Sequence, residues 1–181
     1  RLPGAKNVEE FWENLCEGKE SISFFSESEI DASIPSDVAQ DPSYVAARGI
    51  VDDADCFDAQ FFGVTPRESA LIDPQQRILL EVAWSALEDA GCIPEKYAGT
   101  IGVWAGSYTN TYFVKNILTN PKLVETTGEF QIGVYNEKDY IATRIAHKLD
   151  LTGPAVNVNT ACSTSLVAVI EACNSLALGH C

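Results

Sequence analysis

The stretch AVNVNTACSTSLVAVIEACNSLALGHC, residues 155–181, carries the strongest indication of the fold. It begins with apolar and polar residues in alternation, passes through Thr-Ala-Cys, and continues as a largely apolar run. Alternation is typical of a strand, whereas apolar residues three and four positions apart are typical of a helix. We therefore expect a buried strand over residues 155–159 and a helix over residues 162–178, closed by Gly179, with Cys162 at the joint.

The clearest helix in the sequence lies over residues 73–91. Asp73 can cap it, Pro74 suits the first helical position, and Gln76 can complete a capping box. Its apolar stripe predicts packing into a core rather than ligand binding, and Gly91 is placed to end it.

The N-terminal part of the chain predicts one helix and a long irregular connection. Residues 7–22 have apolar side chains at helical spacing, and Gly18 can end that helix. Residues 23–70 have scattered Pro, Asp and Ser, with aromatic pairs at positions 24–25 and 61–62. Because aromatic side chains favour burial, we expect a packed connection rather than a flexible linker.

The remaining segments complete an alternation of strands and helices. Residues 100–107 are a short apolar run that predicts a buried strand. Residues 136–151 predict a helix with Asn136 as its cap, ended by the segment that contains Pro154. The order helix, strand, helix, strand, helix, with connections long enough for parallel pairing, predicts a layered α/β fold in one domain.

Composition excludes several classes of function. The 181 residues carry a formal net charge of −14, which argues against binding to nucleic acid or to an anionic membrane surface. No apolar run approaches the ~20 residues of a membrane helix, and the charged N-terminus does not resemble a signal peptide. The six cysteines show no metal-binding spacing, so we expect free thiols in a reducing cytoplasm.

Cys162 is the candidate nucleophile because of its predicted place at a helix N-terminus. Unpaired backbone N–H groups there favour a thiolate and can bind a developing oxyanion. Its neighbours are small, so a substrate can reach the sulfur. The other interpretation is a small buried hydrophobic residue, which is the usual role of a free cysteine. Neither His147 nor His180 is placed as its base, so the residues alone leave both interpretations open.

Several longer segments resemble one family of enzymes. NTACSTSLVAVIEACNSLALG is similar to the active-site segment of β-ketoacyl synthases, the condensing enzymes of polyketide and fatty acid synthesis. RLPGAKNVEEFWENLCEGKESI, the segment with DPQQR, and NEKDYIATRIAHKLDLTGPAVNV resemble further segments of these enzymes in the same order. The likeness covers essentially the whole chain, and it points to ketosynthase domains of modular type I polyketide synthases.

The resemblance implies the thiolase-like fold, with α-β-α-β-α layers, of which residues 1–181 are most of the N-terminal half. The expected unit is a partial ketosynthase domain. An initial strand is expected before Arg1, and the C-terminal half, with two catalytic histidines and a lysine, is expected after Cys181.

The resemblance also implies an activity. Cys162 would accept an acyl chain from an acyl carrier protein as a thioester, and its backbone N–H would form part of the oxyanion hole. A decarboxylative Claisen condensation with a malonyl-type carrier thioester would follow. No metal or bound cofactor is implied, because the carrier protein supplies the phosphopantetheine arm.

The implied partners are the carrier protein, other polyketide synthase domains such as an acyltransferase, and a second copy in a homodimer. Residues 155–160 would lie at the dimer interface, and residues 131–136 near the acyl pocket. Asn159 stands where many relatives have Asp, which bears on subtype. Two alternatives stay open, a ketosynthase of fatty acid synthesis and a non-elongating domain that binds carriers and only transfers acyl chains.

Overall fold

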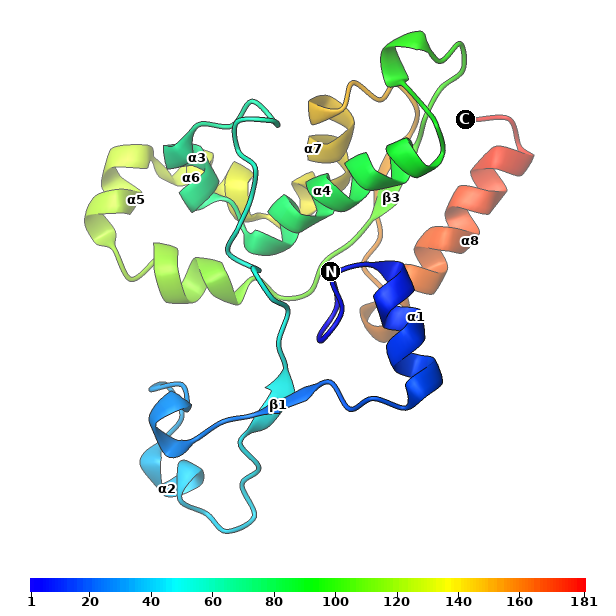
Figure 1. The fold of residues 1–181 in the computed structure, drawn as a ribbon. Helices are drawn as coiled ribbons and strands as arrows, with labels where there is room; N and C mark the ends of the chain where they lie inside the picture. The colour runs from blue at the N-terminus through cyan, green and yellow to red at the C-terminus, as the bar shows by residue number, and fades with distance from the viewer. The chain divides into compact units, whose positions relative to one another are not determined.

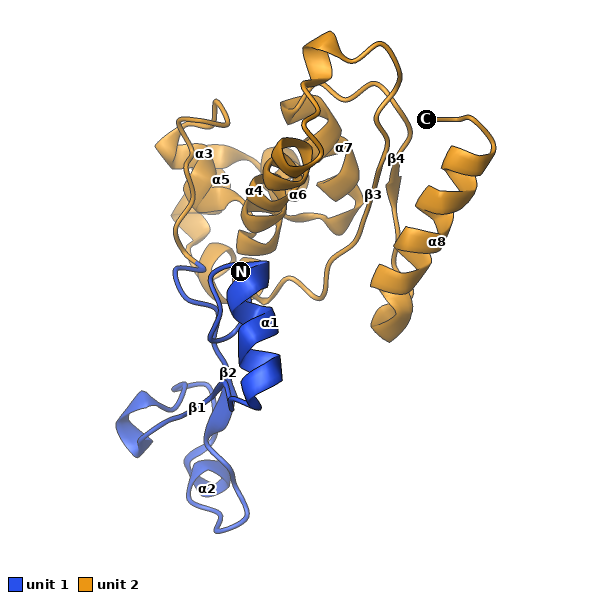
Figure 2. Cartoon of the chain, turned by 45° about the vertical axis from the view of Figure 1, so that its right-hand side comes forward, with its two compact units in different colours: residues 1–54 blue, residues 55–181 orange.

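The computed structural model describes residues 1–181, which form two compact units, residues 1–54 and residues 55–181 (Figure 2). The first unit begins with helix α1, Val8–Glu17. Asn7 caps this helix by accepting a hydrogen bond from the N–H of Glu10, and Gly18 ends it in the left-handed conformation, at φ 65°. The predicted N-terminal helix and its end at Gly18 are therefore confirmed.

The connection after α1 contains short elements that the sequence did not predict. Strand β1, Ile22–Phe24, pairs antiparallel with β2, Ala47–Gly49, and helix α2, Ser36–Ala39, lies between them in the sequence (Figure 1). Burial of its aromatic pair was expected, but Phe24 is 74% exposed. A three-residue strand paired on one edge offers too little surface to cover this ring.

The second unit contains a parallel pair of strands with helices around it. Strand β3, Val103–Ala105, pairs with β4, Ala155–Asn157, in the register Val103 to Ala155. Its helices are α3 (Pro66–Leu71), α4 (Pro74–Asp89), a π-helical turn (Phe113–Ile117), α5 (Pro121–Thr127), α6 (Glu129–Asn136), α7 (Ile141–Lys148) and α8 (Thr164–Ala177). Short 3-10 turns span Pro94–Lys96, Lys138–Tyr140 and Ala161–Ser163.

The two strands separate the helices of this unit. Helices α4 and α7 lie on one side of β3 and β4, and α8 lies on the other (Figures 1 and 2). Side chains of a strand alternate between its faces, so Val103 and Ala105 pack against the core while Trp104 faces α8. The core is built from Phe62, Val64, Leu71, Ile72, Leu80, Leu87, Ile117, Ile132, Tyr135, Ile141, Ile145 and Leu149.

The second aromatic pair of the predicted connection is buried as expected. Phe62 is 7% exposed and stacks on Phe57, with 5.3 Å between ring centroids. Phe61 meets Trp84 of α4 edge to face at 4.9 Å. These contacts fix the start of the second unit against α4.

Two predicted helix caps are wrong. Asp73 does cap α4, by accepting from the N–H of Gln75, but the side chain of Gln76 forms no capping box. It donates to the carbonyl oxygen of Glu137 and accepts from Nε of Arg144. Asn136 does not start a helix, because it is the last residue of α6. In both cases the side-chain amide, predicted to cap a helix, forms hydrogen bonds with residues distant in the sequence instead.

Helix α8 is rich in apolar residues, yet most of its side chains are exposed. Among its apolar residues only Ala168 is buried, and Leu166, Val169 and Leu176 are each at least 60% exposed. Cys173, expected to be structural, is also exposed, and all six cysteines are free. None of the helices has the length and apolarity needed to cross a membrane.

Candidate functional site

Cys162 lies in the turn that joins β4 to α8. The turn is a 3-10 helix, Ala161–Ser163, so α8 begins at Thr164, two residues after the thiol. Cys162 is exposed. The predicted place at the joint is confirmed, and the interpretation of Cys162 as a buried hydrophobic residue does not fit this exposure.

The backbone of the turn is strained and held by its own side chains. Ala161 has φ 53°, a left-handed conformation that costs an L-residue about 1–2 kcal/mol. The hydroxyl of Thr164 donates to the carbonyl oxygen of Ala161 at 2.8 Å and accepts from the N–H of Thr160 at 3.0 Å. The hydroxyl of Ser163 donates to the carbonyl oxygen of Thr160 at 2.8 Å. Such strain persists where surrounding bonds fix it, and it is typical of functional turns.

The backbone N–H of Cys162 is available to a ligand. The N–H of Ser163 donates to Thr160 and that of Thr164 to Ala161, whereas the N–H of Cys162 has no acceptor in the turn. On such a residue the thiol can attack a carbonyl carbon while the N–H donates a hydrogen bond to the oxygen of the same carbonyl.

Strand β3 approaches the turn so closely that only glycine fits at its end. A Cβ on Gly106 would clash with the carbonyl oxygen of Val158 and would lie 2.7 Å from Cγ2 of Thr164. The chain segment after β3 therefore leaves the sheet directly beside the Cys162 turn.

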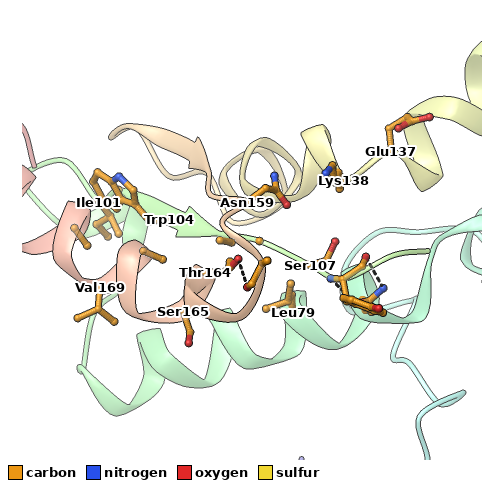
Figure 3. Close-up of a pocket in the computed structure, with 18 of the residues that line it drawn as sticks. Leu79, Ile101, Trp104, Ser107, Glu137, Lys138, Asn159, Thr164, Ser165 and Val169 are labelled. Carbon is orange, nitrogen blue, oxygen red and sulfur yellow. Dashed lines mark hydrogen bonds between the residues drawn. The ribbon is translucent and has the colours of Figure 1, made fainter. Parts of the chain in front are cut away.

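A hollow of about 1350 Å³ follows the free edge of β3 between α4 and α8 (Figure 3). Cys162, Asn159 and Asn136 line it, whereas Gln131, His147 and His180 do not. Trp104, Ile101, Val169 and Leu176 form its apolar part. The hollow thus has a polar end with the thiol and an apolar remainder beside an open strand edge.

Two segments at the polar end are held by amide side chains that sequence reasoning missed. Gln75 binds Tyr108 in the segment after β3, and Asn110 of that segment donates to Asn136. Gln76 donates to Glu137 in the segment after α6. Their partners lie 26 to 61 positions away in the sequence, so periodicity carries no signal of them. The only sign in the sequence was that DPQQR places two adjacent amides three and four positions before the first apolar residues of α4, on the side of the helix that is buried.

Burial shifts the ionisation of two groups behind these segments. Desolvation raises the pKa of Asp73, which is 3% exposed, although hydrogen bonds from Gln75 oppose the shift. Desolvation also lowers the pKa of Arg144, which donates to Gln76 and to the carbonyl oxygen of Val134. Buried polar groups therefore support the two segments at the polar end of the hollow.

The sequence comparison decides the family. The family model described as beta-ketoacyl synthase, N-terminal domain, matches residues 1–181. The chain belongs to this family. The ketosynthase chain is 46% identical, over its whole length, to a phenolphthiocerol/phthiocerol polyketide synthase protein of Mycobacterium tuberculosis, of which it spans 13%. It is 37% identical to the polyketide synthase PksN of Bacillus subtilis, with 99% of the chain and 3% of that protein covered.

Solved structures agree with this assignment. The crystal structure of ketosynthase twelve from the bacillaene polyketide synthase of Bacillus amyloliquefaciens matches 99% of the ketosynthase chain, with a TM-score of 0.84 and 36% identity. The chain covers 31% of that structure. The predicted thiolase-like fold, present as its N-terminal part, is therefore confirmed.

Proposed function

We propose that the ketosynthase chain is the nucleophile-bearing part of an elongating ketosynthase in a modular polyketide synthase. One observation carries the proposal, namely that Cys162 presents an exposed thiol and a free backbone N–H from one strained turn. Its relatives among the curated proteins are polyketide synthases, which does not favour the fatty acid alternative.

The first step is transfer of an acyl chain to the thiol. The sulfur of Cys162 attacks the carbonyl carbon of an acyl thioester on the carrier protein, and a new C–S bond forms. The oxyanion accepts a hydrogen bond from the N–H of Cys162. The C–S bond to the phosphopantetheine arm then breaks, and the thiol proton leaves with that arm.

The second step forms the carbon–carbon bond. A malonyl-type carrier thioester loses carbon dioxide, and the resulting carbanion attacks the acyl thioester on Cys162. The C–S bond to Cys162 breaks, its electron pair returns to the sulfur, which takes a proton from solvent, and the β-ketoacyl product stays on the carrier. The two histidines expected outside residues 1–181 would assist decarboxylation and stabilise the enolate oxygen. An acyltransferase domain would load the extender unit, and the free thiol requires a reducing compartment, the cytoplasm.

We also propose that residues 1–181 are a partial domain. The N–H and C=O groups of Val103 and Ala105 face β4, so those of Trp104 face the hollow at the other edge of β3. A further strand from outside residues 1–181 fits this edge, with the C-terminal half against α8. The outer edge of β4 is likewise open, and pairing there with a second copy would form the homodimer.

The test uses the complete ketosynthase domain, incubated with acyl-carrier thioesters and followed by intact mass. We expect a mass gain in the wild type and in Cys173→Ala, and none in Cys162→Ala. Cys173 is the matched control because it is another exposed thiol on the same structural segment. Acylation that persists in Cys162→Ala would show that Cys162 is not the nucleophile.

A second assay separates elongation from simple transfer. Malonyl carrier protein is added to the acylated domain, and the carrier is analysed for a β-ketoacyl product. A product supports the elongating enzyme. Acylation without any product from a folded domain would support the non-elongating alternative.

A further inference from the structure

Gln75 holds the backbone of Tyr108 at two points. The N–H of Tyr108 donates to Oε1 of Gln75 at 3.0 Å, and Nε2 of Gln75 lies 3.4 Å from the carbonyl oxygen of Tyr108. The same Nε2 donates to Oδ2 of Asp73 at 3.1 Å. Because Asp73 is 3% exposed, it fixes the orientation of the Gln75 amide.

A second amide pair holds the same segment two residues later. Nδ2 of Asn110 donates to the carbonyl oxygen and to Oδ1 of Asn136, at 3.0 and 3.1 Å. Asn136 is 4% exposed and its own Nδ2 donates to the carbonyl oxygens of Leu71 and Ile132. Residues 107–110 are therefore attached to two buried groups and are not an independent loop.

The segment lies beside the candidate nucleophile. It follows Gly106, which is in contact range of Val158 and Thr164 at the Cys162 turn. Ser107, Tyr108 and Cys162 line the same hollow. The segment and the thiol therefore border the same space.

Capping of α4 does not account for the Gln75 side chain. Asp73 already caps the helix by accepting from the backbone N–H of Gln75 at 2.9 Å. The side chain makes its further bonds to Tyr108, 33 positions away in the sequence. Its bonds thus connect the cap of α4 to the segment beside the thiol.

We propose that Gln75 is a positioning residue, which fixes residues 107–110 beside Cys162 so that the acyl thioester is held for attack by the thiol. The inference rests on the proposed acyl transfer. Small displacements of groups that position a substrate lower the rate strongly, because they remove the aligned geometry of the reacting atoms.

Two variants and one control test this role in the complete ketosynthase domain. Gln75→Met keeps the length of the side chain and removes all its hydrogen bonds. Gln75→Glu keeps an acceptor for the N–H of Tyr108 and loses the donor. Glu88→Met is the control, since it places the same side chain on an exposed position of α4.

Three quantities are measured for each protein. Hydrogen exchange of peptides that contain Tyr108 reports whether its N–H is still bonded. The kcat and KM of acylation by an acyl carrier thioester report positioning. The alkylation rate of Cys162 by iodoacetamide, a small reagent that does not need the segment, reports the thiol itself.

For Gln75→Met we expect faster exchange at Tyr108 and a fall in kcat/KM for acylation of about tenfold or more. Alkylation of Cys162 should stay within about twofold of the wild type, because the turn keeps its own bonds. Gln75→Glu should lower kcat/KM as well, because its carboxylate has no donor for the carbonyl oxygen of Tyr108 and lies beside the carboxylate of Asp73. Glu88→Met should match the wild type.

Two results would overturn the inference. One is acylation of Gln75→Met at the wild-type kcat/KM. The other is an equal loss of acylation and alkylation together with a lower Tm, which would make Gln75 a purely structural residue. If Gln75→Met does not fold, a wild-type kcat/KM in Gln75→Glu overturns it instead. Failure of the proposed function is distinct, because the wild type itself would not be acylated.

Discussion

Helices α7 and α8 flank the same two strands and differ in how much of them is covered. Helix α7 carries charged residues, yet Ile141, Ala142 and Ile145 are at most 3% exposed. Helix α8 is the more apolar, yet Leu166 is 64% exposed and Val169 60%. An amphipathic helix buries its apolar stripe, whereas a helix that is apolar on most sides is typical of a protein interior.

The difference indicates a division of roles within the second unit. The side with α4 and α7 contains the buried core of residues 55–181. The side with α8 carries the Cys162 turn and leaves a large apolar surface uncovered, which is typical of an interface. Three predictions, from the largest expected effect to the smallest, test this division.

Gly106→Ala should have the largest effect on acylation, and it should act on the α8 side. The added methyl would clash with Val158 and Thr164, so the Cys162 turn must move. We expect acylation to fall about 100-fold or more and the domain to lose about 1–3 kcal/mol of stability. Acyl-transfer kinetics and urea denaturation of the complete domain measure both.

Gly133→Ala is the matched control for this substitution. A Cβ on Gly133 meets nothing within 4 Å, and Gly133 lies inside α6. Alanine should therefore stabilise the helix by about 0.5–1 kcal/mol, in contrast to the loss expected for Gly106→Ala. If Gly106→Ala were as harmless as Gly133→Ala, the close approach of β3 to the turn would be refuted.

Leu80→Ala and Leu166→Ala compare the two sides directly. Leu80 of α4 is fully buried, so its truncation should cost about 2–5 kcal/mol. If α8 is covered in the complete domain, Leu166→Ala should cost a similar amount there, despite its 64% exposure in residues 1–181. Denaturation midpoints of the complete domain give both values. A cost below about 0.5 kcal/mol for Leu166→Ala would mean that α8 stays exposed.

Asp73→Asn should have the smallest effect, visible only in its pH dependence. Burial raises the pKa of Asp73 above 3.8, so the folded domain binds this proton more readily than the unfolded chain. Stability of the wild type should therefore fall as pH rises from 3.8 through the raised pKa, and the variant should lack this fall. Urea denaturation between about pH 3 and 6 measures the difference between the two proteins.

Asp41→Asn provides a control of opposite sign. Hydrogen bonds from the side chain and backbone of Ser43 hold the pKa of Asp41 below 3.8, so its carboxylate stabilises the fold at higher pH. That contribution should be lost as pH falls through the lowered pKa. Parallel curves for Asp73→Asn and wild type across the whole range would contradict the burial of Asp73.

The sequence was sufficient for the elements that local physics determines. Gly18, Gly91 and Gly179 each end a helix with positive φ, as their spacing predicted. The apolar stripe over residues 73–91 predicted α4, and the change from alternation to helical spacing placed Cys162 at a joint. These features depend on neighbours within one or two turns of the chain.

The sequence was insufficient where distant partners compete for a side chain. Asn136 looked like a cap, but its amide bonds to Leu71, 65 positions away, and Gln76 bonds to Arg144, 68 positions away. The short helices α3, α5 and α6 have six to eight residues each, which is too few for periodicity to distinguish them from loops. The amides around Tyr108 depend on the same long-range geometry.

The left-handed conformation of Ala161 also bears on when the site is prepared. Its conformational cost is incurred once, when the chain folds, and it is not repeated in each catalytic cycle. The N–H of Cys162 therefore has no acceptor in the turn before any acyl group arrives. Each turnover of the proposed reaction can begin without a rearrangement of the backbone that carries the thiol.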